Sequence, residues 1–377
     1  MPKKKELAVY IHIPFCERKC NYCDFTSFDD RPGQMQHYVD ALCGEIRGYR
    51  ERLKDHVVGT IYIGGGTPSL LSNAQMSQII TCLRENYDVR KITDRKFEFT
   101  IECNPNSVTA GKLEHWFWNL QANRISLGLQ SLNDDVLNVL GRAHDGKRAR
   151  YALRLIEKAG FGNISIDLIY AVPYKNLTFR RDMLEEVATL ICRHPITHVS
   201  LYELTLEQHT PLWVQCQQQQ LVQYTADESI IEQSSAANVL EYYGFKRYEV
   251  SNFAVRGFEC RHNNTYWHPE AEYLGLGLGA SGLLDNTRYQ NTEDLDLYLL
   301  KPDKVSHKHE RSEQDLQIER VMLGLRTRRG VPIKHLSDKG REIAELLSYG
   351  MIRVTSTHVH ATKAGFMVLN KVIDTLT

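Results

Sequence analysis

The sequence predicts an α/β fold: a partial (βα)6 TIM-like barrel followed by a small C-terminal module. Short runs of apolar and β-branched residues recur between residues 8 and 203, and each precedes a segment with helical periodicity. These runs are mostly apolar, as in strands that are covered on both faces. Polar residues gather where the runs end. Together these observations favour a parallel sheet with helices outside it.

The expected strands and helices alternate along the chain. The strands are expected at residues 8–13, 60–63, 96–102, 124–129, 164–169 and 198–203. The helices are expected at residues 34–53, 73–86, 109–121, 133–140, 146–159 and 179–193. Ser72 and Thr109 are typical N-cap residues for the second and third helices, and Gly160 typically follows the end of such a helix.

The polar residues at the strand ends favour a barrel over its alternative, a doubly wound sheet. They are His12, Gly64 to Gly66, Glu102, Gln130, Asp167 and Glu203. In a barrel the carboxyl ends of all strands converge on one face, which is where barrel active sites lie. Six units in place of eight predict an open barrel.

The rest of the chain predicts an extension and a second, smaller domain. A helix is expected over 226–243 and a strand over 246–250, before a segment rich in Gly and aromatic residues. Residues 350–365 have the pattern of a hairpin before a last helix, which is typical of a winged-helix domain. The expected regions are a barrel over 1–250, an extension over 251–300, a linker over 301–312 and a helical, winged-helix-like domain over 313–377.

Composition excludes several classes of protein. The 46 basic and 46 acidic residues balance, which argues against binding of nucleic acid by bulk charge. No apolar stretch is long enough to span a bilayer, and no apolar run of signal-peptide length precedes the first strand. We therefore expect a cytoplasmic protein. Nine cysteines, mostly scattered along a chain of this length, do not make a disulfide framework.

Three cysteines follow the first expected strand directly: Cys16, Cys20 and Cys23. Thiolates are the usual ligands of a [4Fe-4S] cluster, and three of them would leave one iron open to a small molecule. The alternative is a zinc site with His12 or Asp24 as fourth ligand. Zinc sites usually pair two separated cysteine knuckles, and a second knuckle is missing from this sequence. The spacing therefore predicts an iron–sulfur cluster.

The cysteine segment resembles the motif of the radical S-adenosylmethionine (SAM) superfamily, Cys-x3-Cys-x2-Cys with an aromatic residue, here Tyr22, before the third cysteine. The resemblance implies that SAM chelates the open iron and that an electron from the cluster cleaves its sulfonium to a 5′-deoxyadenosyl radical. It also implies that the glycine run after the second strand accepts bonds from the SAM ammonium, through Gly65, Gly66 and Thr67. Without a following Gly-Lys-Ser/Thr, this run is not a phosphate loop.

Five sequence blocks are similar to one branch of that superfamily, the coproporphyrinogen dehydrogenase-like group. They are Tyr10 to Cys16, Gly64 to Ser69, Arg124 to Gln130, Leu140 to Arg142 and Ile166 to Tyr170. Single polar residues within or near such blocks are often structural. The resemblance implies that SAM contacts Tyr10, Glu102, Gln130, Arg142 and Asp167. Some members of the group hold two SAM molecules.

Within this group, the chain is most similar to the HemW-type heme chaperones. Phe25 stands where the dehydrogenases carry a fourth cysteine, and the dehydrogenases have a longer N-terminal arm. The run from His262 to Trp267 fits the His-Asn-x-x-Tyr-Trp motif of the HemW type. An imidazole is a normal axial ligand of heme iron, so His262 is the candidate heme ligand, with Cys260 a weaker one. The alternative is that His262 and Trp267 pack the loop beneath the barrel mouth.

The resemblance implies three cofactors: a [4Fe-4S] cluster, SAM and heme. The implied function is binding of heme and its transfer to an acceptor hemoprotein, with an electron donor as a further partner and a membrane-associated acceptor as one option. The first alternative is an oxygen-independent coproporphyrinogen III dehydrogenase. The second is a radical SAM enzyme for another substrate that its C-terminal domain recognises.

Overall fold

The computed structural model describes residues 4–175 and 182–377, and its centre is a parallel sheet. The parallel strands are β1 (Lys5–Ile13), β2 (His56–Gly65), β3 (Glu98–Cys103), β4 (Arg124–Gln130), β5 (Ile164–Tyr170) and β6 (His198–Glu203). Each pairs in parallel with the next along the chain. The six strands expected from the sequence are therefore confirmed, with shifts of a few residues at their ends.

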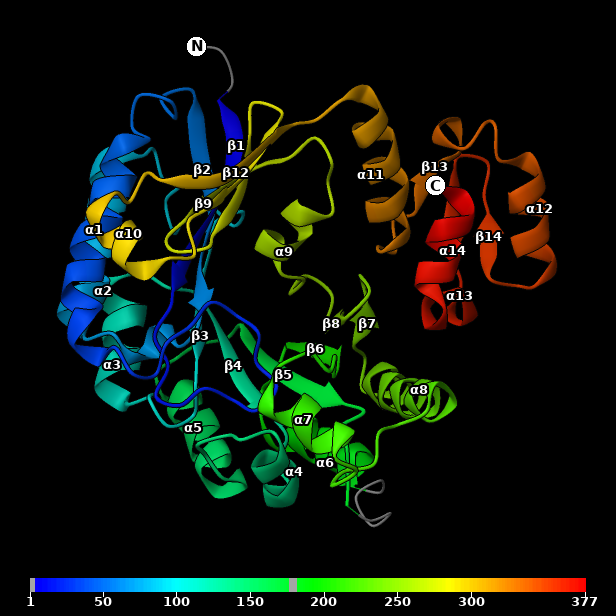
Figure 1. Ribbon diagram of the computed structural model, residues 1–377, viewed down its shortest axis with the longest axis horizontal. Helices are drawn as coiled ribbons and strands as arrows, with labels where there is room; N and C mark the ends of the chain where they lie inside the picture. Colours follow the sequence, from blue (N-terminus) through cyan, green and yellow to red (C-terminus); the bar gives the residue numbers. More distant parts are fainter. Residues whose placement is uncertain (1–3, 176–181) are drawn as a thin grey trace.

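The helices that connect these strands cover the outer face of the sheet (Figure 1). They are α1 (Met35–Gly48), α2 (Asn73–Asn86), α3 (Ala110–Glu114), α4 (Asp134–Val139), α5 (Gly146–Lys158) and α6 (Asp182–Arg193). Ser72 caps α2 in a capping box and Thr109 caps α3, both as predicted. The expected third helix continues from α3 as a π-helical turn, η3 (His115–Asn119). The predicted start of the sixth helix lies outside the described residues.

Further strands extend the sheet at both edges without closing it within the described residues. β9 (Glu272–Leu276) pairs in parallel with β1, and β10 (Ser281–Leu284), β11 (Thr287–Asn291) and β12 (Val305–Glu310) follow antiparallel. At the other edge, β8 (Asn252–Ala254) pairs with β6, and β7 (Lys246–Arg247) pairs with β8. Within the described residues β7 and β12 end the strand order without pairing with each other.

Residues 301–312 are a correction to the sequence analysis, which predicted a linker there. They contain β12, whose residues are almost all exposed and which is held by backbone pairing with β11. An exposed edge strand lacks the apolar alternation by which strands are predicted. The strand expected over 246–250 is likewise only two residues long.

The C-terminal residues form a module with its own core. It comprises α11 (Glu313–Leu325), β13 (Val331–Pro332), η5 (Ile333–His335), α12 (Gly340–Ser348), β14 (Ile352–Val354), β15 (His358–Ala361), α13 (Lys363–Met367) and α14 (Leu369–Leu376). The antiparallel pair β14–β15 confirms the expected hairpin. The winged-helix assignment and the domain boundaries stay predictions.

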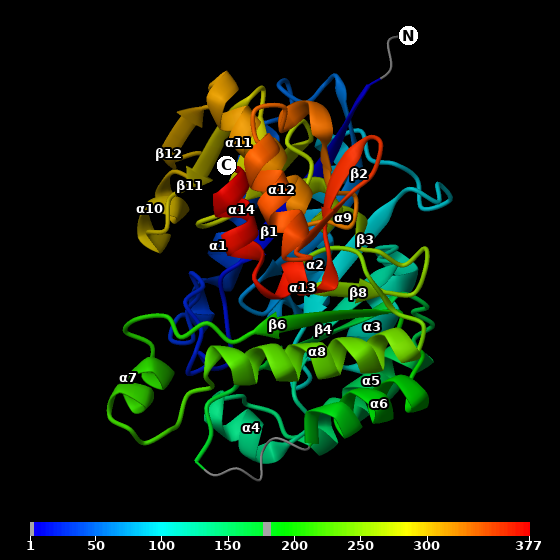
Figure 2. The same ribbon diagram turned by 90° about the vertical axis from the view of Figure 1, so that its right-hand side faces the viewer.

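The module rests beside α8 (Ala226–Tyr242), as Figure 2 shows. An ion pair of 2.6 Å joins Lys363 Nζ on α13 to Glu241 Oε2 on α8. The remaining helices are α7 (Pro211–Gln217), α9 (Arg261–Tyr266) and α10 (Leu295–Leu300).

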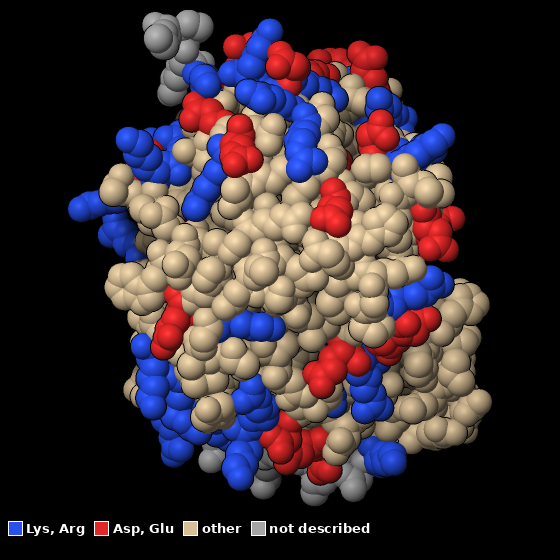
Figure 3. All heavy atoms as spheres, turned by 90° about the vertical axis from the view of Figure 1, so that its left-hand side faces the viewer, with Lys and Arg blue, Asp and Glu red and all other residues tan. Residues whose placement is uncertain are grey.

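The surface shows both signs of charge. On the face over α1 and α2, charged side chains lie mostly toward the rim (Figure 3). In residues 4–175 and 182–377, no helix is both long and apolar enough to cross a membrane. Cytoplasmic localisation and the absence of a nucleic-acid partner stay predictions.

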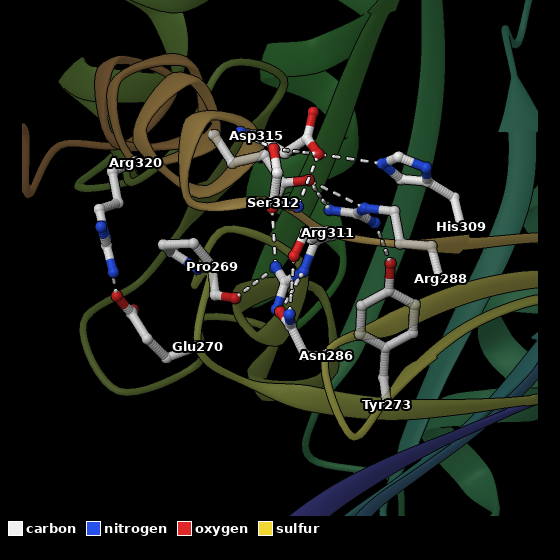
Figure 4. A network of polar contacts seen from close by, with 11 residues as sticks. Pro269, Glu270, Tyr273, Asn286, Arg288, His309, Arg311, Ser312, Asp315 and Arg320 are labelled. Atoms are coloured by element: carbon white, nitrogen blue, oxygen red, sulfur yellow. Dashed lines mark hydrogen bonds and ion pairs between the residues drawn. The ribbon is translucent and has the colours of Figure 1, made fainter.

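Arg311, between β12 and α11, joins the module to the barrel (Figure 4). Its Nη1 donates to Pro269 O at 2.7 Å and to Glu319 Oε2 at 2.8 Å, and its Nε donates to Asn286 Oδ1 at 3.1 Å. The side chains of Arg311 and Glu319 are only 6% and 12% exposed. Removal of Arg311 would leave the buried Pro269 O without this donor, whereas Glu319 would keep its ion pair with Arg288 Nη2 at 2.8 Å.

We therefore expect Arg311→Met to lower the free energy of unfolding by about 2 kcal/mol, because it removes buried hydrogen bonds to Pro269 O and Glu319. The matched control is Arg320→Met, which breaks ion pairs to the exposed Glu270 and Glu313 and should cost less than about 1 kcal/mol. Urea denaturation followed by circular dichroism measures both. Equal losses in the two variants would contradict the anchoring role of Arg311.

Candidate functional site

The three predicted cysteines lie together in the loop after β1, at the carboxyl ends of the strands. Cys16, Cys20 and Cys23 are half-buried free thiols that line one cavity of about 490 Å³. The loop is closed at its base, because Cys16 N donates to Phe28 O at 2.8 Å and Phe28 N donates to Pro14 O at 2.7 Å. The sequence prediction that the trio shares one site therefore fits the structure.

The arrangement fits a cluster better than the zinc alternative. Residues 4–175 and 182–377 contain no group of three or more His, Cys, Asp or Glu placed to hold a single metal ion. His12, the zinc alternative's fourth ligand, is engaged elsewhere: its Nε2 donates to Thr26 O at 2.9 Å and its Nδ1 accepts from Tyr10 OH at 3.0 Å. In a cluster each thiolate binds a different iron, so the three sulfurs need not converge on one point.

Burial and nearby polar groups shift the acidity of the cysteine thiols. Burial raises the pKa of Cys16, against hydrogen bonds from Ser27 and Thr67, and burial raises the pKa of Cys23 as well. Arg142 Nη1 lies 3.3 Å from Cys20 Sγ and supplies positive charge there. Metal binding deprotonates thiols that would otherwise stay neutral.

The glycine turn at the end of β2 packs directly against the cysteine loop. Gly66 N donates to Ile13 O at 2.9 Å. A Cβ on Gly66 would lie 2.7 Å from Phe15 O and 3.0 Å from Cys16 Sγ. Gly65 has a φ of +110°, which side-chain-bearing residues rarely adopt. The next residue, Thr67, donates a hydrogen bond from its Oγ1 to Cys16 Sγ at 3.8 Å. Only glycines permit this approach.

Two half-buried carboxyl groups line the cavity. Glu102 accepts from Tyr62 OH at 2.7 Å and from Gly65 N at 3.1 Å, and burial raises its pKa to about 7. Asp167 accepts from Ser126 Oγ at 3.3 Å, and burial raises its pKa too. The buried Arg124 guanidinium lowers the pKa of both acids and so keeps part of their acidity.

Unpaired polar atoms mark a place for a ligand. Gln130 Oε1 and Arg142 Nε are buried without a hydrogen-bond partner among the described residues, and both side chains line the cavity. Gln130 has a φ of +65°, a strained conformation for this residue type. Buried polar atoms without partners are costly, so a polar ligand that pairs with them would relieve that cost.

The remaining predicted residues fall on two adjoining cavities. Tyr22 lines the larger one and interacts with Arg142, while burial raises the Tyr22 pKa. Tyr10 lines a second cavity of about 330 Å³. Gly65 and Glu102 line both cavities, so the two spaces meet at these residues.

His262 lines neither cavity, and its role as a heme ligand stays a prediction. It is 1% exposed on α9, its Nδ1 bonds Thr60 Oγ1 at 2.9 Å, and its Nε2 bonds Tyr266 OH at 2.7 Å. Both ring nitrogens are therefore used. Cys260 is also buried, with its Sγ 3.3 Å from Glu98 Oε1. The sequence alternative, packing of this segment beneath the barrel mouth, describes the structure.

Sequence reasoning missed Tyr62 and Arg124 as parts of the site. Tyr62 bonds Glu102, and Arg124 is 1% exposed at the start of β4. A charged residue at the start of an apolar run was the available signal for Arg124. Tyr62 gave no signal, because a tyrosine inside a strand is common.

Comparison with known proteins identifies the family. Residues 10–187 match the model of the Radical SAM superfamily. "Heme chaperone HemW" of Lactococcus lactis is 34% identical over 98% of this chain and 97% of the relative, and that of Bacillus subtilis is 31% identical over 97% of each. The chain belongs to the HemW family. A mouse relative named "Radical S-adenosyl methionine domain-containing protein 1, mitochondrial" is 31% identical over 98% of this chain and 87% of its own.

A solved structure confirms the fold. Coproporphyrinogen III oxidase (HemN) from Escherichia coli has a TM-score of 0.81 with 20% identity and covers 100% of this chain and 91% of its own. The expected radical SAM type of partial barrel is therefore confirmed. Membership of the Radical SAM superfamily implies a [4Fe-4S] cluster and SAM as cofactors, and the thiol trio and the unpaired Gln130 and Arg142 atoms fit both.

We predict that Gly66→Ala retains less than about half of the iron and sulfide of the reconstituted wild type, because its Cβ would push Phe15 O and Cys16 Sγ away. The control is Gly111→Ala in α3, where a Cβ meets no atom within 4 Å. Iron and acid-labile sulfide analysis measures the loss. Full cluster content in Gly66→Ala would show that the close approach is dispensable.

Proposed function

We propose that the protein binds heme and transfers it to an acceptor hemoprotein. What supports this is the match of almost the whole chain to relatives named heme chaperones, at 31–34% identity. Other partners on this proposal are an electron donor and an acceptor that is membrane-associated in some cases. The place of action is the cytoplasm.

The cluster and SAM form the second part of the proposal. Cys16, Cys20 and Cys23 hold three irons of a [4Fe-4S] cluster, and an exchangeable SAM occupies the fourth. When bound, these groups supply one-electron chemistry at the barrel mouth. The residues proposed to contact SAM line the two cavities: Tyr10, Tyr22, Gly65, Gly66, Thr67, Glu102, Gln130, Arg142 and Asp167.

The alternative is an oxygen-independent coproporphyrinogen III dehydrogenase, and Phe25 favours the chaperone. Phe25 occupies the position at which the sequence analysis expects a fourth cysteine in the dehydrogenases. It is 67% exposed and lines both cavities. A phenyl ring supplies neither thiol nor proton there. The likeness to HemN concerns the fold and does not decide between the two functions.

His262 is the proposed heme ligand, and ligation of heme would need a change in its surroundings. Coordination by His262 would require α9 to leave its position and break the bonds to Thr60 and Tyr266. Loss of these buried bonds is costly.

We expect anaerobically reconstituted protein to take up about one heme per chain with a Soret band, as an axially ligated heme does. The same sample should leave coproporphyrinogen III unconverted in the presence of SAM and a reductant. Absorption titration and product chromatography measure the two activities. Robust conversion to protoporphyrinogen IX would establish the alternative.

SAM binding should depend on pH through Glu102, whose pKa burial raises to about 7. The carboxylate attracts and accepts hydrogen bonds from a cationic ligand, whereas the protonated form has no charge and accepts more weakly. SAM affinity should therefore be full above this pH and fall, by up to about tenfold per unit, as the pH drops below it. Equilibrium dialysis across pH measures the profile. Glu102→Gln should bind weakly at every pH; an unchanged profile in that variant would place the titrating group elsewhere.

A further inference from the structure

Helix α9 carries the motif that the cofactor cavities leave unexplained. It lies on the side of the strands opposite α1 and α2 (Figure 1). Its first turn is fixed by Glu98 on β3, whose carboxylate accepts from Arg261 N at 2.9 Å and His262 N at 3.0 Å. Cys260 caps the helix through its sulfur, which accepts from Asn263 N. The helix is thus built to hold the His262 ring in one place.

The imidazole ring has one fixed orientation. Thr60 on β2 holds Nδ1 and Tyr266 on α9 holds Nε2, so rotation of the ring would break two hydrogen bonds. Burial, and then Arg124, lowers the His262 pKa to about 3, and the ring is therefore neutral at physiological pH. A neutral ring with both nitrogens bonded serves to pack and orient its neighbours.

The His262 ring packs against the partner of a proposed SAM contact. Its centroid lies 5.0 Å from that of Tyr62, with 29° between the ring planes. Tyr62 OH donates to Glu102 Oε1 at 2.7 Å. Tyr10 completes the group, with its ring 6.2 Å from Tyr62 and 6.4 Å from His262. A contact chain therefore leads from the motif helix to the wall shared by both cavities.

We propose that His262 is a positioning residue: it fixes the Tyr62 ring, and through the Tyr62 hydroxyl it fixes the Glu102 carboxylate for SAM. This inference deepens the proposed function and rests on the proposed contact between Glu102 and SAM. It gives His262, the first residue of the His-Asn-x-x-Tyr-Trp segment, a part in SAM binding.

Several groups act on Glu102, so its pH response is not set by Tyr62 alone. They are Tyr10 on β1, Tyr62 on β2, Arg124 on β4, Asp167 on β5, Tyr202 on β6 and Tyr266 on α9. Among these, the Tyr62 hydroxyl stabilises the ionised carboxylate by donating to it, and this lowers the Glu102 pKa. Loss of that bond should raise the pKa, which predicts the direction of the experimental shift.

The experiment compares SAM binding by His262→Gln, Tyr62→Phe and the double variant, all with reconstituted clusters. Glutamine keeps hydrogen-bonding groups but removes the stacked ring, and phenylalanine keeps the ring but removes the hydroxyl. The matched control is His56→Gln, a buried histidine on the same strand β2 that bonds Glu272 at 2.9 Å. Equilibrium dialysis gives the dissociation constant of SAM, and its dependence on pH gives the midpoint of the Glu102 titration.

We expect His262→Gln and Tyr62→Phe each to weaken SAM binding by about five- to tenfold, since each removes support for one charged hydrogen bond. The midpoint should move to higher pH in both, and the double variant should be no worse than Tyr62→Phe, because the two residues act in series. His56→Gln should change neither quantity. A further test is whether another aromatic ring restores the stacking on Tyr62. The His262→Phe variant should therefore bind SAM more tightly than His262→Gln.

A His262→Gln protein with full cluster content, SAM affinity within about twofold of wild type and an unmoved midpoint would overturn the inference. Should His262→Gln fail to fold, Thr60→Val replaces it, because it removes only the hydroxyl at Nδ1; the same two results then decide. Heme titration of the wild type tests the chaperone proposal separately from the positioning role of His262. Absence of heme uptake refutes the chaperone proposal while leaving the SAM measurements to judge His262.

Discussion

The site depends on one close contact, between the glycine turn after β2 and the cysteine loop after β1. Gly66 donates to Ile13 O, and the space where its Cβ would lie is bounded by Phe15 O and Cys16 Sγ. Parallel pairing of β1 with β2 brings the two strand ends to the same edge, and glycine lets them touch. Three sulfurs are thereby placed at the mouth of the cavity that holds the polar side chains of β3 to β5.

The acidity of the two carboxyl groups in the cavity follows from their partial removal from water. Glu102 and Asp167 lose hydration, and their pKa values rise because water is excluded around the charged forms. Arg124 is the buried cation that opposes this rise. Such a site favours a ligand that carries both positive charge and hydrogen-bond donors, as a sulfonium amino acid does, and Tyr62 and α9 give the Glu102 carboxylate a fixed direction.

Much of the fold was predictable because buried strands leave a clear pattern of apolar residues in the sequence. The parallel strands are apolar on both faces, and the cysteine spacing and strand-end positions are local features. Contacts made across the fold were not predictable. The edge strand within 301–312 has exposed side chains and backbone pairing only, and the place of His262 depends on Thr60 and Tyr62, about two hundred residues earlier. The motif match singled out His262 but could not show that both of its ring nitrogens are already hydrogen-bonded.

The central claim is that the trio of sulfurs holds a cluster with one iron reserved for SAM. Mössbauer spectroscopy of anaerobically reconstituted protein, recorded with and without SAM, tests it most directly. The account predicts that SAM shifts the signal of a single iron site and leaves the cysteine-ligated irons as they were. A spectrum that SAM leaves unchanged, or a protein that takes up zinc in place of a cluster at Cys16, Cys20 and Cys23, would contradict it.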